Sequence, residues 1–214
     1  MARSIDIARF REKLIALTAL FKQGKYEECR VQCEALAKQF PNEPTTANLL
    51  GATYAALGRL DEAVASYTRA LKSWPDFAEA HSNLGDAFLG LGKTQKAAAS
   101  YQKAVHLKPE LAVAQTNLGA ALIQLGYPEA AVSSLTKALE IEPDLAEAHN
   151  NLAMALNDLG RPEEAISSLT TALKINPDFA EAHSSLGATL KSFGQTDKAI
   201  ACYSRALKIN PALA

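Results

Sequence analysis

The sequence predicts an all-α fold, a solenoid of antiparallel helix pairs, and three observations support this prediction. Six of the nine prolines stand 34 residues apart, at Pro41, Pro75, Pro109, Pro143, Pro177 and Pro211. A glycine recurs at the same step, at Gly58, Gly92, Gly126, Gly160 and Gly194. Nearly half of the residues are apolar but few are aromatic, so small side chains dominate. A fixed period of about 20–50 residues is typical of repeat architectures, in which each unit buries its apolar face against its neighbours.

Residues 44–77 show what one repeat contains. Apolar or small residues follow helical spacing in its first half, at Ala47, Leu50, Gly51, Tyr54 and Leu57. Gly58 then predicts a helix end in the left-handed conformation. Asp61 and Glu62 suit the N-terminus of a second helix, because acidic side chains interact favourably with the helix dipole there. Pro75 ends the second helix, since proline cannot continue it.

The same pattern divides the chain into six predicted repeats within a single solenoid domain that covers residues 1–214. We expect the repeats at 10–43, 44–77, 78–111, 112–145, 146–179 and 180–213. A small residue recurs early in each second helix, at Ala63, Ala97, Ala131, Ala165 and Ala199, where it allows two helices to approach closely. The first repeat is divergent, because Cys29 and Cys33 stand where alanine and an aromatic residue are usual.

The starts of the first helices carry a further prediction. After several of the prolines an aspartate precedes a glutamate by three residues, at Asp76 and Glu79, Asp144 and Glu147, and Asp178 and Glu181. This spacing predicts a capping box with aspartate in place of serine or threonine.

These residues together resemble the tetratricopeptide repeat family, including bacterial members, over residues 10–213. The resemblance is specific, because several positions recur in five consecutive repeats. It implies that the helix pairs wind into a right-handed superhelix and that the first helix of each pair lines its concave surface.

Composition excludes several classes of function. The net charge is -1, with 22 basic and 23 acidic residues, so no basic surface for nucleic acid is expected. No apolar run approaches the length of a membrane span, and the N-terminus lacks the apolar core of a signal peptide. The three cysteines are too few and too scattered for a disulfide framework. We therefore expect a cytoplasmic protein with no nucleic-acid or membrane partner.

The predicted groove is polar and mildly acidic. At about 100° per residue, repeat positions 2, 5, 6, 9, 12 and 13 share the face of each first helix that lies opposite its packing side. Across the last four repeats these positions hold five acids and one lysine. The groove residues that we single out are Glu79, Asp86, Glu147, Asn150 and Asp158. This charge favours a basic or Ser/Thr-rich partner segment.

An asparagine recurs at repeat position 6, at Asn83, Asn117 and Asn151. A side-chain amide both donates and accepts hydrogen bonds, so a row of amides can bind a peptide backbone whatever its sequence. The surrounding residues resemble the repeat region of O-linked N-acetylglucosamine transferase, which implies that these asparagines hold a substrate backbone. The alternative is that duplication copied the asparagine without a use for it.

Residues that could suggest chemistry are better explained by structure. His81, His149 and His183 lie at multiples of the repeat length, so equivalent nitrogens are too far apart to bind one metal ion. Cys29 and Cys33 are one helical turn apart, but no second ligand pair accompanies them. We predict packing roles for all five, and neither a catalytic residue, a cofactor nor a metal.

The function that follows is a non-enzymatic protein-interaction scaffold that binds an extended peptide in its concave groove, partly through the asparagine ladder. One alternative is a substrate-recruiting arm of a larger enzyme, such as a glycosyltransferase, whose catalytic domain lies outside this chain. Another is a self-assembling module, because the pair after Pro177 is expected to expose an apolar stacking face. Either a continuation of the chain or a second copy could cover that face.

Overall fold

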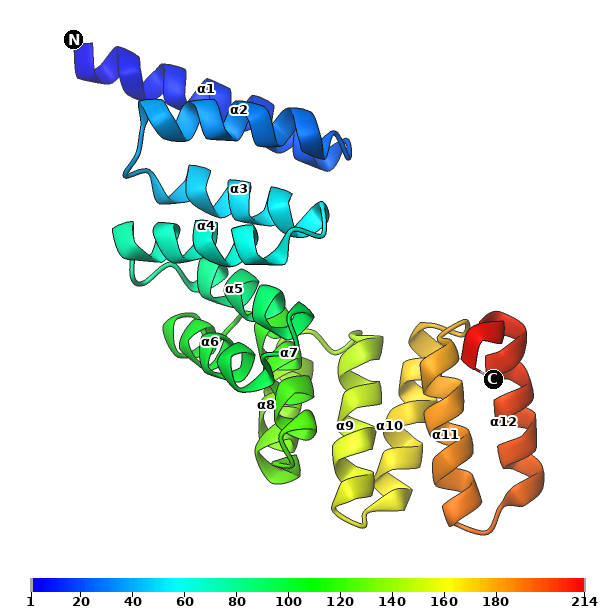
Figure 1. Cartoon of the computed structure of the whole chain (residues 1–214). Helices are drawn as coiled ribbons and strands as arrows, with labels where there is room; N and C mark the ends of the chain where they lie inside the picture. The colour runs from blue at the N-terminus through cyan, green and yellow to red at the C-terminus, as the bar shows by residue number, and fades with distance from the viewer. Residues whose placement is uncertain (1, 214) are drawn as a thin grey trace. The chain divides into compact units, whose positions relative to one another are not determined.

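Helices follow one another in antiparallel pairs along the whole of the described chain (Figure 1). The computed structural model describes the backbone of residues 2–213 and the side chains of residues 8–212. This part of the chain holds α1 (Ala2–Lys22), α2 (Tyr26–Gln39), α3 (Pro44–Ala56), α4 (Leu60–Ser73), α5 (Ala78–Gly90), α6 (Thr94–Leu107), α7 (Ala112–Gln124), α8 (Pro128–Ile141), α9 (Ala146–Asp158), α10 (Pro162–Ile175), α11 (Ala180–Ser192), α12 (Thr196–Ile209) and the short 3-10 helix η1 (Pro211–Leu213). No strand occurs among these residues, which confirms the predicted all-α fold.

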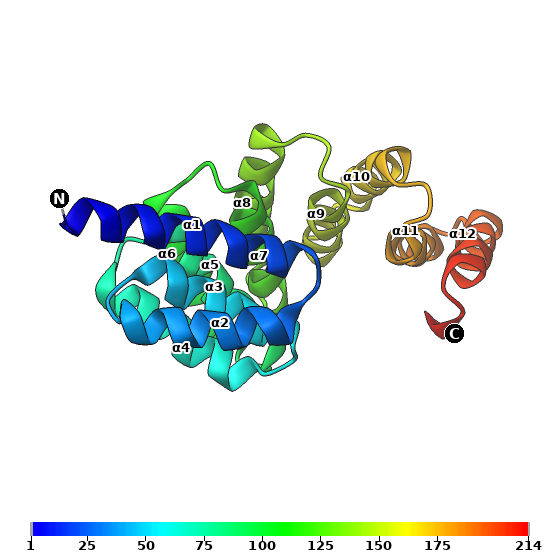
Figure 2. The same ribbon diagram turned by 90° about the horizontal axis from the view of Figure 1, so that it is seen from above.

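The chain forms two compact units, Met1–Leu107 and Lys108–Ala214. We call them unit 1, with α1 to α6, and unit 2, with α7 to α12 and η1. Within unit 2, α9 packs against α10, α10 against α11, and α11 against α12 (Figure 2). The first helices α7, α9 and α11 also contact one another in order. The boundaries of the six repeats, and their membership of a single domain, stay predictions.

The mid-repeat glycines end the first helices, as the sequence predicts. Gly58 has a φ of 73°, in the left-handed region that favours glycine. Its N–H donates to the carbonyl of Ala55 at 2.9 Å, and the N–H of Arg59 donates to the carbonyl of Tyr54 at 2.9 Å. These two bonds form a Schellman motif, which satisfies carbonyls that the helix end would leave unpaired. The left-handed conformation recurs at Gly24, Gly92, Gly126, Gly160 and Gly194.

The predicted capping boxes are wrong. Helix α5 begins at Ala78, and its N-cap Phe77 makes no side-chain capping hydrogen bond. Asp76 therefore precedes the N-cap by one residue and stands outside the position that a capping box requires. Helices α9 and α11 likewise begin after an apolar N-cap without a side-chain capping bond, at Leu145 and Phe179.

Histidine links the start of the first helices to the preceding loops. The Nε2 atom of His81 lies 2.8 Å from the carbonyl oxygen of Pro75. Because a carbonyl can only accept, the ring donates this hydrogen bond. The same contact joins His149 to Pro143 and His183 to Pro177, each at 3.0 Å, while Gln115 donates to Pro109 at 3.4 Å. The three histidines therefore have a structural role, but as hydrogen-bond donors to the loops and not only through the packing that the sequence predicts.

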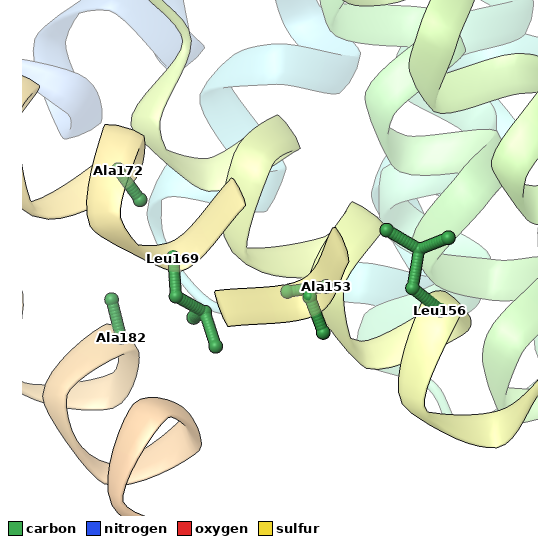
Figure 3. Packing of buried hydrophobic residues seen from close by; sticks show 6 residues of the cluster. Ala153, Leu156, Leu169, Ala172 and Ala182 are labelled. Atoms are coloured by element: carbon green, nitrogen blue, oxygen red, sulfur yellow. The ribbon is translucent and has the colours of Figure 1, made fainter. Parts of the chain in front are cut away.

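Small residues let the two helices of a pair approach closely. A Cβ atom at Gly85 of α5 would lie 2.5 Å from the ring of Tyr101 on α6, which is fully buried. Two repeats later, the equivalent of Gly85 is Ala153 on α9, and the equivalent of Tyr101 is Leu169 on α10. Both are buried in a core cluster with Leu156, Ala172 and Ala182 (Figure 3). A larger side chain on one helix is thus matched by a smaller one on the other.

Cys29 and Cys33 are buried in an apolar core between α1, α2 and α3. They lie in a core cluster with Leu17, Leu36 and Leu50. Their Sγ atoms are 3.8 Å apart, and both thiols are free. Burial raises the pKa of the Cys33 thiol, so the unreactive protonated form dominates at neutral pH. The predicted packing role of this cysteine pair is confirmed.

Candidate peptide-binding face

The predicted binding positions of unit 2 lie on α7, α9 and α11. Each of these first helices packs against the second helix of its own pair, and α9 also contacts both α7 and α11. We call the surface that carries repeat positions 2, 5, 6, 9, 12 and 13 of α7, α9 and α11 the first-helix face. Repeating side chains on this face come from neighbouring helices, whose axes typically lie about 8–10 Å apart.

Two of the ladder asparagines belong to this face. Asn117 on α7 and Asn151 on α9 are both half-buried. The side chain of Asn151 has no hydrogen-bond partner among the described residues, whereas Asn117 already has an interaction partner within the chain. The amide of Asn151 is therefore the one with its hydrogen-bonding capacity still unused.

Asn150 differs from its neighbour, because it is only 6% exposed. Its Oδ1 atom is buried and has no hydrogen-bond partner within the described chain. Its Nδ2 atom lies 3.9 Å from the sulfur of Met154, one helical turn away. A thioether is a weak acceptor, and Met154 itself is 42% exposed on the same face. A buried amide oxygen without a partner typically costs about 1–3 kcal/mol.

Acidic side chains share the first-helix face with these amides. Glu147, Asp158 and Glu181 are exposed, and none of them forms an ion pair with another described residue. Lys191 on α11 is the basic residue at these positions of unit 2. The first-helix face of unit 2 therefore carries an excess of uncompensated negative charge.

In unit 1 the predicted site residues are engaged with the protein itself. The Nδ2 of Asn83 donates to Oδ1 of Asn48, on the neighbouring helix α3, at 3.1 Å. Asp86 accepts a hydrogen bond from the hydroxyl of Tyr101 at 2.7 Å. Glu79 is exposed and also has an interaction partner within the chain. Part of the hydrogen-bonding capacity of this set is thus used to join helices.

One side-chain hydrogen bond between α9 and α11 is not predicted by the sequence. The Nδ2 of Asn157 donates to the hydroxyl of Thr189 at 2.7 Å, and Thr189 is buried. The residues stand at different positions of their repeats, so the repeat period does not pair them. This bond links two of the helices that carry the face.

Comparison with known proteins decides the family. Residues 10–213 match the tetratricopeptide repeat family described as the cilia and flagella-associated protein 70 C-terminal domain. The chain belongs to this tetratricopeptide repeat family. No functionally curated protein matches it by sequence.

Solved structures share the tetratricopeptide fold. TTC0263, a thermophilic tetratricopeptide repeat protein of Thermus thermophilus, is 31% identical with a TM-score of 0.64, over 78% of this chain and 92% of that one. MamA is 26% identical with a TM-score of 0.68, over 76% and 95%. YrrB, described as having an unusual peptide-binding site, is 22% identical with a TM-score of 0.70, over 84% and 92%. At that identity the likeness to YrrB concerns the fold alone. The shared fold is that of a protein-interaction scaffold.

In the described part of this tetratricopeptide repeat chain, no group of three or more His, Cys, Asp or Glu side chains could hold a metal ion. Among the described residues, none of the helices is both long and apolar enough to cross a lipid bilayer. The cytoplasmic location stays a prediction.

On the last helix pair, Phe193, Ile200 and Leu207 are exposed, as the sequence predicts for an apolar stacking face.

Proposed function

We propose that the chain is a peptide-binding scaffold and that the first-helix face of unit 2 holds an extended peptide through side-chain amides. The unsatisfied Oδ1 atom of Asn150 is the observation that carries this proposal, because a buried acceptor without a partner is rare in folded proteins. A peptide N–H that reaches this oxygen would satisfy it, and Met154, whose sulfur lies beside the Nδ2 atom of the same amide, is flexible enough to adjust. The free amide of Asn151 stands next to it on the same face.

The same face favours a basic or Ser/Thr-rich segment. The carboxylates of Glu147, Asp158 and Glu181 have no ion-pair partner among the described residues. They can therefore attract a cationic peptide without losing an ion pair inside the protein. Asn83 is proposed as a further contact on unit 1, where its amide also serves Asn48. Glu79 and Asp86 would add negative charge there.

Titration of two synthetic peptides tests this function. A 12-residue peptide of alternating lysine and serine is expected to bind more tightly than one of alternating glutamate and serine. Substitution Asn150→Ala together with Asn151→Ala removes two amides, which is expected to cost about 2 kcal/mol, or roughly thirtyfold in Kd. The matched control is Gln102→Ala, which removes an exposed amide from the second helix α6.

The proposal fails if the double substitution leaves the Kd unchanged, or if Gln102→Ala has the same effect. Preference for the acidic peptide on this face would refute the charge assignment alone.

Self-assembly is a second candidate, favoured by the exposed apolar residues of the last pair. Ile200 and Leu207 on α12 are 58% and 40% exposed. If they form a contact between copies, light scattering will show a mass that rises with protein concentration. Ile200→Glu with Leu207→Glu would then restore the monomer mass, and a constant monomer mass in the unsubstituted chain would exclude this candidate.

A further inference from the structure

Unit 1 has a cleft on the side formed by its second helices. Helices α2 and α4 both pack against α3 but, among the described residues, not against each other. Between them lies a cleft of about 330 Å³ whose floor includes Leu50 and Tyr54 of α3. Its walls include Ala37 and Ala65, which are small enough to leave room for an inserted side chain. The cleft therefore has an apolar floor that is open to a partner.

The acids of this cleft are already neutralised. Glu34 accepts a hydrogen bond from the hydroxyl of Tyr54 at 2.6 Å and another from Arg30 at 2.8 Å. These contacts hold the pKa of the Glu34 carboxyl below its ordinary value. Glu62, at the other wall, is paired with Arg59 at 2.6 Å. Neither carboxylate leaves its negative charge uncompensated.

The cations that line the cleft form no close ion pair, although the positive charge of Lys38 also acts on the Glu34 carboxylate. Lys38 and Arg69 line it, and Arg69 also lines an adjoining hollow of about 470 Å³ together with Asn42, Lys72 and Ser73. None of the three cations forms an ion pair with a described residue. The cleft and its extension thus carry an excess of positive charge, opposite in sign to the first-helix face of unit 2.

We propose that this cleft, here called the outer cleft, binds an acidic peptide segment that inserts an apolar side chain over Leu50 and Tyr54 and places carboxylates on Arg69 and Lys72. The stretch of α4 from Glu62 to Ser73 is about 16 Å long at 1.5 Å per residue. That length accommodates about five residues of an extended peptide. Arginine suits this role because its planar guanidinium can bind a carboxylate with two parallel hydrogen bonds.

The repeat architecture supplies matched controls for a binding test. The probe is a fluorescein-labelled hexapeptide of alternating glutamate and leucine, and its anisotropy reports binding. Arg69→Glu with Lys72→Glu is expected to weaken binding about tenfold or more, because attraction becomes repulsion. Lys103→Glu changes the equivalent of Arg69 one repeat later, at an exposed position of α6, and is expected to leave binding within about twofold.

A steric pair separates a defined cleft from diffuse charge. Ala65→Trp fills the cleft from an exposed position of α4 without changing charge and is expected to block the probe. Ala99→Trp places the same ring at the equivalent exposed position of α6 and is expected to have no effect. Circular dichroism checks that each variant is folded as helix. The proposal is overturned if the unsubstituted chain does not bind the probe, if Ala65→Trp binds it normally, or if the matched controls weaken binding equally.

Discussion

Single side chains decide how closely the paired helices approach. Gly85 faces the buried ring of Tyr101, and a Cβ atom there would come within 2.5 Å of the ring. We expect Gly85→Ala to destabilise unit 1 by about 1–2 kcal/mol, because overpacking exceeds the gain in helix propensity. The midpoint of urea unfolding, followed by circular dichroism, measures this change.

The control for this prediction is Gly119→Ala in unit 2. Its partner is Leu135, and the repeat that follows already pairs Ala153 with Leu169, both fully buried. A leucine side chain can rotate away from an added methyl group, so we expect an effect below about 0.5 kcal/mol. Equal destabilisation by both substitutions would show that the partner side chain does not decide the cost.

The contribution of the Glu34 carboxylate to folding stability depends on pH. Its pKa is lowered, first by the hydrogen bond from Tyr54 and then by Arg30. Because the folded pKa lies below the unfolded value, the contribution of Glu34 to stability is present above the unfolded pKa and is lost as the pH falls through the folded one. We expect Tyr54→Phe to raise the pKa of Glu34 toward the ordinary value of about 4.3, measured by NMR titration of its side chain. An unchanged pKa would mean that the hydroxyl is not its main cause.

At the scale of the helix, a side chain at repeat position 4 links the start of α5, α7, α9 and α11 to the preceding loop. His183 donates to the carbonyl of Pro177 at 3.0 Å, and Gln115 makes the equivalent bond to Pro109. We expect His183→Leu to lower the stability of unit 2 by about 0.5–1.5 kcal/mol, the net value of one hydrogen bond. His183→Gln should retain most of this stability, because glutamine can donate the same hydrogen bond. Thermal unfolding of both variants provides the comparison. A glutamine variant as unstable as the leucine variant would assign the loss to ring packing instead.

The sequence predicts the ends of the helices better than their beginnings. Glycine at Gly58 and its equivalents marks a left-handed backbone that other residues adopt at a cost, so the residue type alone identifies the position. Asp76 has no such restriction. It fits a capping box in spacing, but the helix begins at Ala78, two residues after it, and the spacing cannot show that shift.

At the scale of the whole chain, the period predicts which side chains repeat but not which of them pair. Asn83 and Asn151 stand at the same repeat position, yet Asn83 donates to Asn48 while Asn151 keeps an unused amide. The difference comes from the residue on the preceding first helix, at another position of its repeat. The sequence places Asn150 among the groove residues, but it predicts neither the burial of that side chain nor the outer cleft, because both depend on neighbouring helices.

Extending the amide row by one repeat tests the peptide-binding account most directly. Ser185 is half-buried on α11 and stands 34 residues after Asn151. Calorimetric titration with the lysine–serine peptide should show that Ser185→Asn tightens binding by about 1 kcal/mol, or roughly fivefold in Kd, because one more amide contacts the peptide backbone. Ser204→Asn, at an exposed position of α12 in the same repeat, should leave the Kd unchanged. Unaltered or weaker binding by Ser185→Asn, or an equal gain from Ser204→Asn, would contradict the account.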